Sequence, residues 1–302
     1  MNLRRLLQSA LFELFDAVRS RRALVLIILY LIVSLLTMGG TITALGKMED
    51  QLADTLGIEQ VEGKSGLVSA TLWKSKPFQR LARHVVDDSL IYDDIVGRHP
   101  AELLYAWLVF LFVPLMTVLF TSNRVAGDVR SGAVRYMLTR VTRLEWSLGK
   151  YLGNAVLILA GLLVGAVAAW GVAAWKLSGA DIPALLSAMI GWSLKAWILS
   201  LAWLGMALGV SHLFKTPGKA DGIALMMLFV FSVASGVLGL ISKFEGFAAK
   251  LSFLTSLFPS GVEDALWRAS FAPVALASLW LIALGLFYLS LGYARFARRD
   301  VR

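Results

Sequence analysis

The chain has 302 residues, of which 58% are apolar, and a formal net charge of +9. Soluble domains average about 45–50% apolar residues, so this composition excludes an ordinary soluble domain and predicts a membrane protein. The sequence contains no cysteine, which excludes disulfides, thiol catalysis and cysteine-ligated metal sites.

Residues 1–22 predict an amphipathic helix. Apolar residues recur there at steps of three and four, the period of one helix face: Leu3, Leu7, Leu11, Leu14 and Val18. We interpret the segment as an elbow helix that lies in the membrane interface and bends into the first span. The alternative is an exposed amphipathic tail. The residues assigned to the elbow are Arg4, Arg5, Leu7, Leu14 and Arg19.

Six apolar runs are each long enough to cross a bilayer, which takes about 20 residues. The spans are predicted at residues 23–45, 103–122, 151–175, 193–212, 222–242 and 271–294. No small-residue cleavage site follows the first run, so we expect it to be retained as a span. The predicted fold is therefore an all-α integral membrane protein, with residues 1–302 forming a single transmembrane domain and both termini on one side.

The charge distribution predicts which side that is. Segments on the side of the termini hold 17 Lys and Arg against six acids, whereas the opposite segments hold 11 against 14. The positive-inside rule then places both termini in the cytoplasm. We attribute the basic balance to topology and to attraction for anionic membrane lipids, and we expect no binding of nucleic acid.

The outer segments, residues 46–102 and 243–270, are too short for independent domains. The first has helical spacing around residues 78–86, and the second predicts one or two short helices that dip into the membrane interface. Two histidines and two acid pairs in the first segment raise a metal hypothesis: His84, His99, Asp87, Asp88, Asp93 and Asp94. Their spacing matches no known ligand pattern, so we favour solvated charge.

Lys195 is the one charged residue inside a predicted apolar run, which extends over residues 182–214. An intramembrane charge is a candidate pathway residue for a substrate or proton. The alternative, which we favour, is a lysine in the first turn of the span that snorkels to the outer interface beside Trp192 and Trp197.

Residues 121–150 hold six Lys and Arg against two acids. An apolar stripe at helical spacing runs through them: Val134, Met137, Leu138, Val141, Leu144 and Leu148. Because Gly127 and Gly132 precede the stripe, we predict a short turn and then a single amphipathic helix that leads through Gly149 and Lys150 into the third span. A basic helix at a membrane face can bind lipid or an acidic groove of a partner.

Motifs of catalysis are missing from the chain. Gly63-Lys64-Ser65 resembles the end of a phosphate-binding loop, but Ile58 stands where that loop requires glycine. His212, at the inner end of the fourth span, is interpreted as an interface residue. We therefore predict that the chain is not an enzyme and binds no cofactor or metal itself.

The order of these elements resembles the membrane subunit of ABC-2-type transporters. The motif that carries the resemblance runs through residues 121–150: Asp128, Gly132, Met137-Leu138, Val141-Thr142-Arg143 and Gly149-Lys150. The family more often has Glu in place of Asp128 and proline in place of Arg140. The C-terminal residues 295–300 also resemble the family's ending. Within the family, the chain is similar to the permease of nitrous-oxide-reductase maturation systems.

This resemblance implies that residues 123–150 are a coupling segment seated in a cleft of a separate cytosolic ABC ATPase. The partner, expected in two copies, would bind ATP and Mg²⁺, and a second permease copy or a related permease would complete the assembly in a prokaryotic cytoplasmic (inner) membrane. The residues assigned to the ATPase interface are Asp128, Gly132, Arg135, Leu138, Arg140, Arg143, Glu145 and Lys150.

The expected function is a permease that couples ATP hydrolysis by its partner to export of a substrate. A close alternative is a mechanotransmitter that passes ATP-driven motion to an outer-side partner protein through residues 46–102. A non-transporting membrane anchor or assembly factor, and a membrane-embedded enzyme using Lys195 and His212, are the other hypotheses. The sequence does not specify the substrate.

Overall fold

The computed structural model describes residues 2–56, 89–177, 181–241 and 251–298. Every regular element in these ranges is helical, which confirms the predicted all-α fold for the described part of the chain. The elements are α1 (Leu3–Arg19), α2 (Arg21–Leu56), α5 (Ser89–Ile95), α6 (Pro100–Thr121), α7 (Arg124–Ser131), α8 (Ala133–Met137), α9 (Arg143–Lys176), α10 (Ile182–Leu213), α11 (Pro217–Ile241), the short 3₁₀ helices η1 (Leu251–Leu257), η2 (Pro259–Gly261) and η3 (Glu263–Trp267), and α13 (Phe271–Ala297). The predicted helix near residues 78–86, His84, Asp87 and Asp88 lie outside the described residues.

Six of these helices are long and apolar enough to cross a membrane. They cover Arg21–Ala44, Pro100–Ser131, Arg143–Lys176, Ile182–Leu213, Pro217–Ile241 and Phe271–Ala297. The prediction of six spans is thereby confirmed within the described ranges. The fourth helix begins well before residue 193, because the Asp181 side chain accepts a hydrogen bond from the Ala184 amide (3.1 Å) and Pro183 lies in the first turn. A cap sets where a helix begins, whereas hydropathy reports only the part that suits the bilayer.

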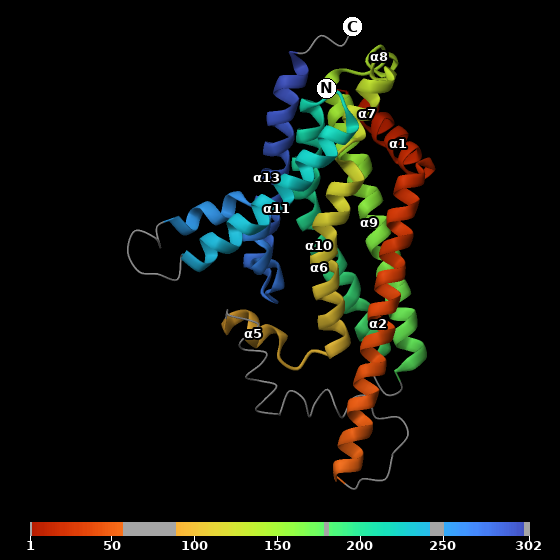
Figure 1. The fold of residues 1–302 in the computed structure, drawn as a ribbon, viewed down its shortest axis with the longest axis vertical. Helices are drawn as coiled ribbons and strands as arrows, with labels where there is room; N and C mark the ends of the chain where they lie inside the picture. The colour runs from red at the N-terminus through yellow and green to blue at the C-terminus, as the bar shows by residue number, and fades with distance from the viewer. Residues whose placement is uncertain (1, 57–88, 178–180, 242–250, 299–302) are drawn as a thin grey trace.

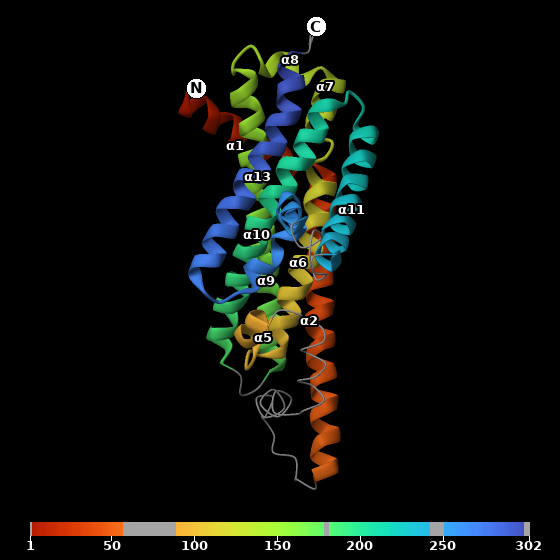
Figure 2. The ribbon, with the colours of Figure 1, turned by 90° about the vertical axis from the view of Figure 1, so that its left-hand side faces the viewer.

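Helix α10 forms the centre of the bundle, and 83% of its most apolar stretch is buried. Helices α6, α9 and α13 pack against it, as Figures 1 and 2 show. Gly205 and Gly209 meet the backbone of α13 so closely that an added Cβ would collide with the carbonyl groups of Gly285 and Tyr288. The Gly205-xxx-Gly209 spacing thus permits a close helix contact between α10 and α13.

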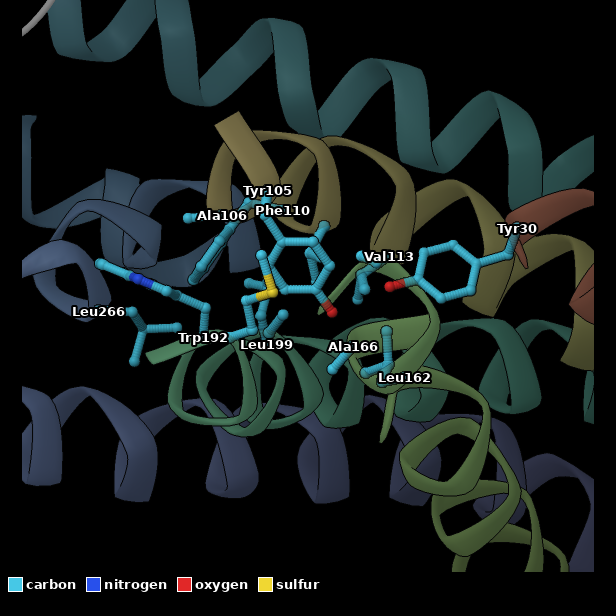
Figure 3. Packing of buried hydrophobic residues seen from close by; sticks show 14 of the residues in the cluster. Tyr30, Tyr105, Ala106, Phe110, Val113, Leu162, Ala166, Trp192, Leu199 and Leu266 are labelled. Atoms are coloured by element: carbon cyan, nitrogen blue, oxygen red, sulfur yellow. The ribbon is translucent and has the colours of Figure 1, made fainter. Parts of the chain in front are cut away.

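The main core lies between α6, α9 and α10 (Figure 3). Phe110 of α6 packs against Trp192 of α10, with ring centroids 6.2 Å apart. The Tyr105 hydroxyl is hydrogen-bonded to Ser193 Oγ at 2.8 Å. Such pairing satisfies polar groups that would otherwise be orphaned inside an apolar bundle.

Helix α11 is the most exposed of the six spans, since only 6% of its most apolar stretch is buried. It leans outward from the bundle, and η1 and η2 pack against it (Figure 1). Large apolar side chains such as Phe229 and Leu240 are more than 60% exposed. A surface of this kind requires an apolar environment, which lipid or another membrane protein supplies.

Both termini lie at the same end of the bundle (Figure 1). The Asn2 amide donates to Glu145 Oε1 at 2.6 Å, and Arg143 Nη1 donates to the Ala297 carbonyl at 2.7 Å. Helices α1, α7, α8, the start of α9 and the end of α13 therefore meet there. We call this part of the molecule the termini end.

Candidate functional site at the termini end

Helix α7 is anchored by its first turn to the central helix α10. Asn123 precedes α7 and makes no side-chain cap. Instead, Ser211 Oγ of α10 accepts hydrogen bonds from the Val125 and Ala126 amides, each at 3.1 Å. Free amides at a helix start need an acceptor, and here another helix provides it. The position of α7 is thus fixed by the core.

The prediction of a single amphipathic helix after Gly132 is wrong, because the segment is divided between two helices. Gly132 ends α7 in the left-handed conformation, at φ +79°, which glycine adopts at little cost. Helix α8 follows and stops at Met137, and α9 begins only at Arg143. There Thr142 and Glu145 form a capping box. The Thr-x-x-Glu pattern was visible in the sequence and marks this start.

A buried ionic cluster joins three elements beside this break. Lys150 Nζ of α9 lies 2.5 Å from Glu13 Oε2 of α1 and 2.8 Å from Asp128 Oδ2 of α7. Asn154 Nδ2 donates to the other Glu13 oxygen at 3.0 Å. Only 3% of Lys150 and 2% of Glu13 are exposed. We call Glu13, Asp128, Lys150 and Asn154 the ionic anchor.

Arg124 supports the anchor from its edge. Its Nη1 lies 3.3 Å from Asp16 Oδ2, and its Nε lies 4.0 Å from Glu13 Oε1. Burial by itself raises the pKa of Glu13, but the attraction and hydrogen bond of Lys150, with a further contribution from Arg124, hold that pKa below its usual value. Glu13 is therefore ionised at neutral pH.

Two glycines of α9 let α1 approach the anchor. A Cβ added to Gly153 would lie 2.7 Å from the Ala10 carbonyl oxygen and 2.9 Å from Glu13 Cβ. A Cβ added to Gly149 would collide with the Ser9 side chain. Gly149 and Lys150 thus act as a pair, in which the glycine allows close packing and the lysine supplies the charge.

Helix α1 packs on the protein through a narrow mixed face and leaves its apolar stripe exposed. Its buried residues are Leu6, Ser9, Glu13 and Ala17. The stripe predicted from the sequence is largely exposed: Leu3, Leu7, Leu11 and Val18 are 47–65% exposed, and Leu14 is half-buried. Arg4, Arg5 and Arg19 are also exposed. This arrangement is the reverse of a soluble amphipathic helix and suits one that touches lipid.

Arg143 and Glu145 serve the internal structure of the termini end. Arg143 Nη1 donates to the Phe296 and Ala297 carbonyls at 3.0 and 2.7 Å, which stabilises the last turn of α13. The Glu145 carboxylate accepts from the Thr142 amide at 3.0 Å as well as from Asn2. Of the residues assigned to the ATPase interface, four thus bind other parts of their own chain: Asp128, Arg143, Glu145 and Lys150.

The exposed part of the segment lies on α7, α8 and the turn after α8. Its members are the exposed residues Arg130, Arg135, Tyr136, Thr139 and Arg140, which we call the α8 surface. Tyr136 is 80% exposed. The sequence analysis did not select it, because that analysis followed an apolar stripe through a single helix, and this helix ends at Met137. Asp128, Gly132 and Leu138 are half-buried behind this surface. In both ribbon views α8 lies at the extremity of the molecule (Figures 1 and 2).

His212 packs in the core below α8 and is 1% exposed. Its Nδ1 lies 2.7 Å from the Leu208 carbonyl and its Nε2 3.0 Å from Ser147 Oγ. A carbonyl can only accept, so Nδ1 carries the proton and Nε2 accepts from the Ser147 hydroxyl. Both ring nitrogens are occupied, and the ring stacks edge-on against Trp146 and Phe296. His212 is a packing residue here.

Lys195 lies about four turns into α10 rather than in its first turn, because the helix starts at Ile182. Its Nζ donates to the Arg268 carbonyl at 2.9 Å and sits 4.6 Å from the Trp192 ring centroid. Trp192 Nε1 in turn donates to Glu102 at 2.9 Å. Lys195 thus ties α10 to the segment before α13, at the end opposite to α8.

In the described part of the chain, no group of three or more His, Asp or Glu residues is placed to hold a metal ion. His99 has its Nδ1 3.2 Å from the Ala101 amide, where it caps α6. The described acids of the metal hypothesis, Asp93 and Asp94, precede that cap, and Asp94 Oδ2 accepts from the Ala269 amide at 2.8 Å.

Comparison with known families decides the class of protein. A family model described as "ABC-2 family transporter protein" matches residues 7–301, nearly the whole chain. The chain belongs to the ABC-2 transporter family. A search of curated proteins finds no match to the chain. With six apolar helices, this ABC-2 protein is a multi-pass membrane permease, and its family implies an ABC ATPase subunit as partner.

Proposed function

We propose that this ABC-2 permease couples ATP hydrolysis by a separate cytosolic ATPase to export of a substrate, and that the α8 surface is where the ATPase docks. The observation that carries the proposal is an 80%-exposed tyrosine, Tyr136, among exposed arginines. Tyrosine and arginine are the residues that most often dominate binding energy at protein interfaces.

The way α7 is held supports a role in transmission. Its first turn binds Ser211 of α10, and Asp128 binds Lys150 of α9. Just before α7, Ser122 donates to Asp221 of α11, which also accepts from Arg22 of α2 at 3.0 Å. A displacement of α7 is therefore passed to several spans at once, which a two-state transport cycle requires.

The wider assembly follows from the same proposal. The termini end faces the cytoplasm, in agreement with the charge distribution, and the membrane is the prokaryotic inner membrane that the family resemblance implies. Two ATPase copies bind ATP and Mg²⁺, and two permease chains form the pathway. The exposed apolar face of α11 offers area for lipid or for a second permease.

The test is co-purification of the permease with its partner ABC ATPase. The double reversal Arg135→Glu with Arg140→Glu places acids on the α8 surface, so association is expected to fall by about tenfold or more. The matched control is Lys215→Glu with Lys219→Glu, which reverses two exposed basic residues just before α11 and in its first turn. Equal retention of the ATPase by both variants would refute the docking assignment.

The mechanotransmitter hypothesis uses the same cytoplasmic machinery but an outer-side partner. Much of the segment that motivates it, residues 57–88, lies outside the described residues, as does any contact it makes. The similarity to permeases of nitrous-oxide-reductase maturation stays a prediction with it. Crosslinking of an outer-side protein to residues 57–88 would distinguish this function from export.

A further inference from the structure

Lys150 is the point where α1, α7 and α9 are joined. Its side chain is 4% exposed and that of Glu13 3%, so the ion pair between them is shielded from water. Buried ion pairs resist separation, because removing one partner leaves the other as an uncompensated charge in an apolar environment. Asp128 adds a second acid to the same ammonium group at 2.8 Å.

Outside the ionic anchor, α1 is held by its packing on α9 and by two polar contacts, from the Asn2 amide to Glu145 and from Arg124 of α7 to Asp16. A single residue, Ser20, links it to α2, in an extended conformation at φ −74° and ψ 124°. Its outward face is apolar and exposed, with Phe12 and Phe15 55% and 64% exposed. Among the spans, α1 packs chiefly on α9, at the glycines next to Lys150. The anchor is the most buried ionic contact of α1.

We propose that Lys150 is a positioning residue that makes the elbow helix part of the moving unit: displacement of α7 reaches α1 through Asp128, Lys150 and Glu13. The inference rests on the proposed function, since it requires an ATPase that displaces the α8 surface. It adds that each cycle moves an apolar helix along the cytoplasmic face of the membrane. A purely static brace would hold α1 in place while α8 moves.

The absence of cysteine from the sequence allows spin labels to be placed without background. Labels are introduced as cysteines at Phe12 in α1, at the exposed Ala133 in α8, and at Phe271, which is 86% exposed at the start of α13. The permease–ATPase complex in lipid nanodiscs, diluted with unlabelled chains, is measured with and without ATP and vanadate. Two distances are recorded, Ala133 to Phe271 and Phe12 to Phe271.

The test variant is Glu13→Gln with Asp128→Asn and Lys150→Met, which removes the ionic anchor without leaving an unpaired buried charge. With the native anchor, both distances are expected to shift with nucleotide. In the variant, the Ala133 distance still shifts, whereas the shift of the Phe12 distance falls at least twofold. The control is Lys176→Met, at the exposed far end of α9, where both shifts persist.

Two outcomes overturn the proposal. In one, the Phe12–Phe271 distance shifts as much in the triple variant as in the protein with the native anchor. In the other, the protein with the native anchor shows a shift of the Ala133–Phe271 distance but none of the Phe12–Phe271 distance. Failure of the ATPase to bind, seen by co-purification of the same samples, overturns the proposed function and this inference with it. If the triple variant does not fold, Glu13→Gln alone replaces it. This substitution keeps the size of the side chain but replaces one oxygen by an NH₂ group and removes the charge, and it is expected to reduce the Phe12 shift partially.

Discussion

Lys150 and Arg140 belong to the same basic segment, but their surroundings are opposite. Lys150 is 3% exposed and bound between two carboxylates of its own chain, whereas Arg140 is exposed on the turn after α8. The difference teaches that a basic residue on the cytoplasmic side can hold the permease together or contact a partner. The positive-inside rule counts both kinds alike.

The largest effect on stability is expected when the buried residue of this pair, Lys150, is replaced. Lys150→Met leaves Glu13 and Asp128 without their cation, so stability is expected to fall by about 3–5 kcal/mol. The measurement is the thermal unfolding midpoint of the detergent-solubilised protein. Lys176→Met, on the same helix but exposed, is expected to change stability by less than about 0.5 kcal/mol. Similar midpoints for the two variants would contradict the buried anchor.

A smaller loss is expected when α1 is pushed off α9 without any change of charge. Gly153→Ala places a Cβ 2.7 Å from the Ala10 carbonyl oxygen, and overpacking of this kind costs about 1–3 kcal/mol. The control Gly171→Ala, with nothing within 4 Å of the new atom, is expected to be neutral or slightly stabilising. The two thermal midpoints are compared, and no difference between them would argue against the close contact.

The anchor also predicts a sensitivity to acid. The pKa of Glu13 is lowered in the folded state, so its stabilising contribution is complete above the usual value of 4.5 and is lost as the pH falls through the folded pKa. Wild type is therefore expected to lose more stability on acidification from neutral pH than Glu13→Gln does. Parallel curves of unfolding midpoint against pH would show that this carboxylate is not paired as described.

The smallest effect on stability is expected on the exposed α8 surface. Tyr136 is 80% exposed, so Tyr136→Ala should change the free energy of unfolding by less than about 0.5 kcal/mol. The same substitution is expected to weaken ATPase binding by about tenfold or more, as truncation of an aromatic anchor does. Phe15→Ala, 64% exposed on α1, is the control for binding. Unchanged affinity in Tyr136→Ala would remove this residue from the docking surface.

Local patterns predicted much of the fold. The six spans follow from runs of apolar residues, because the bilayer demands a length that can be counted. The missed break between α8 and α9 was also local, since Gly132 and the Thr142–Glu145 capping box both mark it. Periodicity alone ran across that break.

The candidate site was less predictable. Residues 123–150 were selected as the coupling segment, but nothing in their spacing shows that Lys150 pairs with Glu13, far away in the sequence, on a different helix. The exposure of the apolar stripe of α1 was unpredictable for the same reason. A helix wheel gives two faces, and only the neighbouring helix and the lipid decide which is turned inward.

By itself, the sequence determined the class of protein, the number of spans and the distribution of charge between the two sides. These depend on composition, run length and local charge, each of which acts without reference to distant residues. The tertiary structure decided which basic side chains are bound inside and which face outward. That choice depends on the desolvation of each charge and on the partners that folding brings within hydrogen-bond distance.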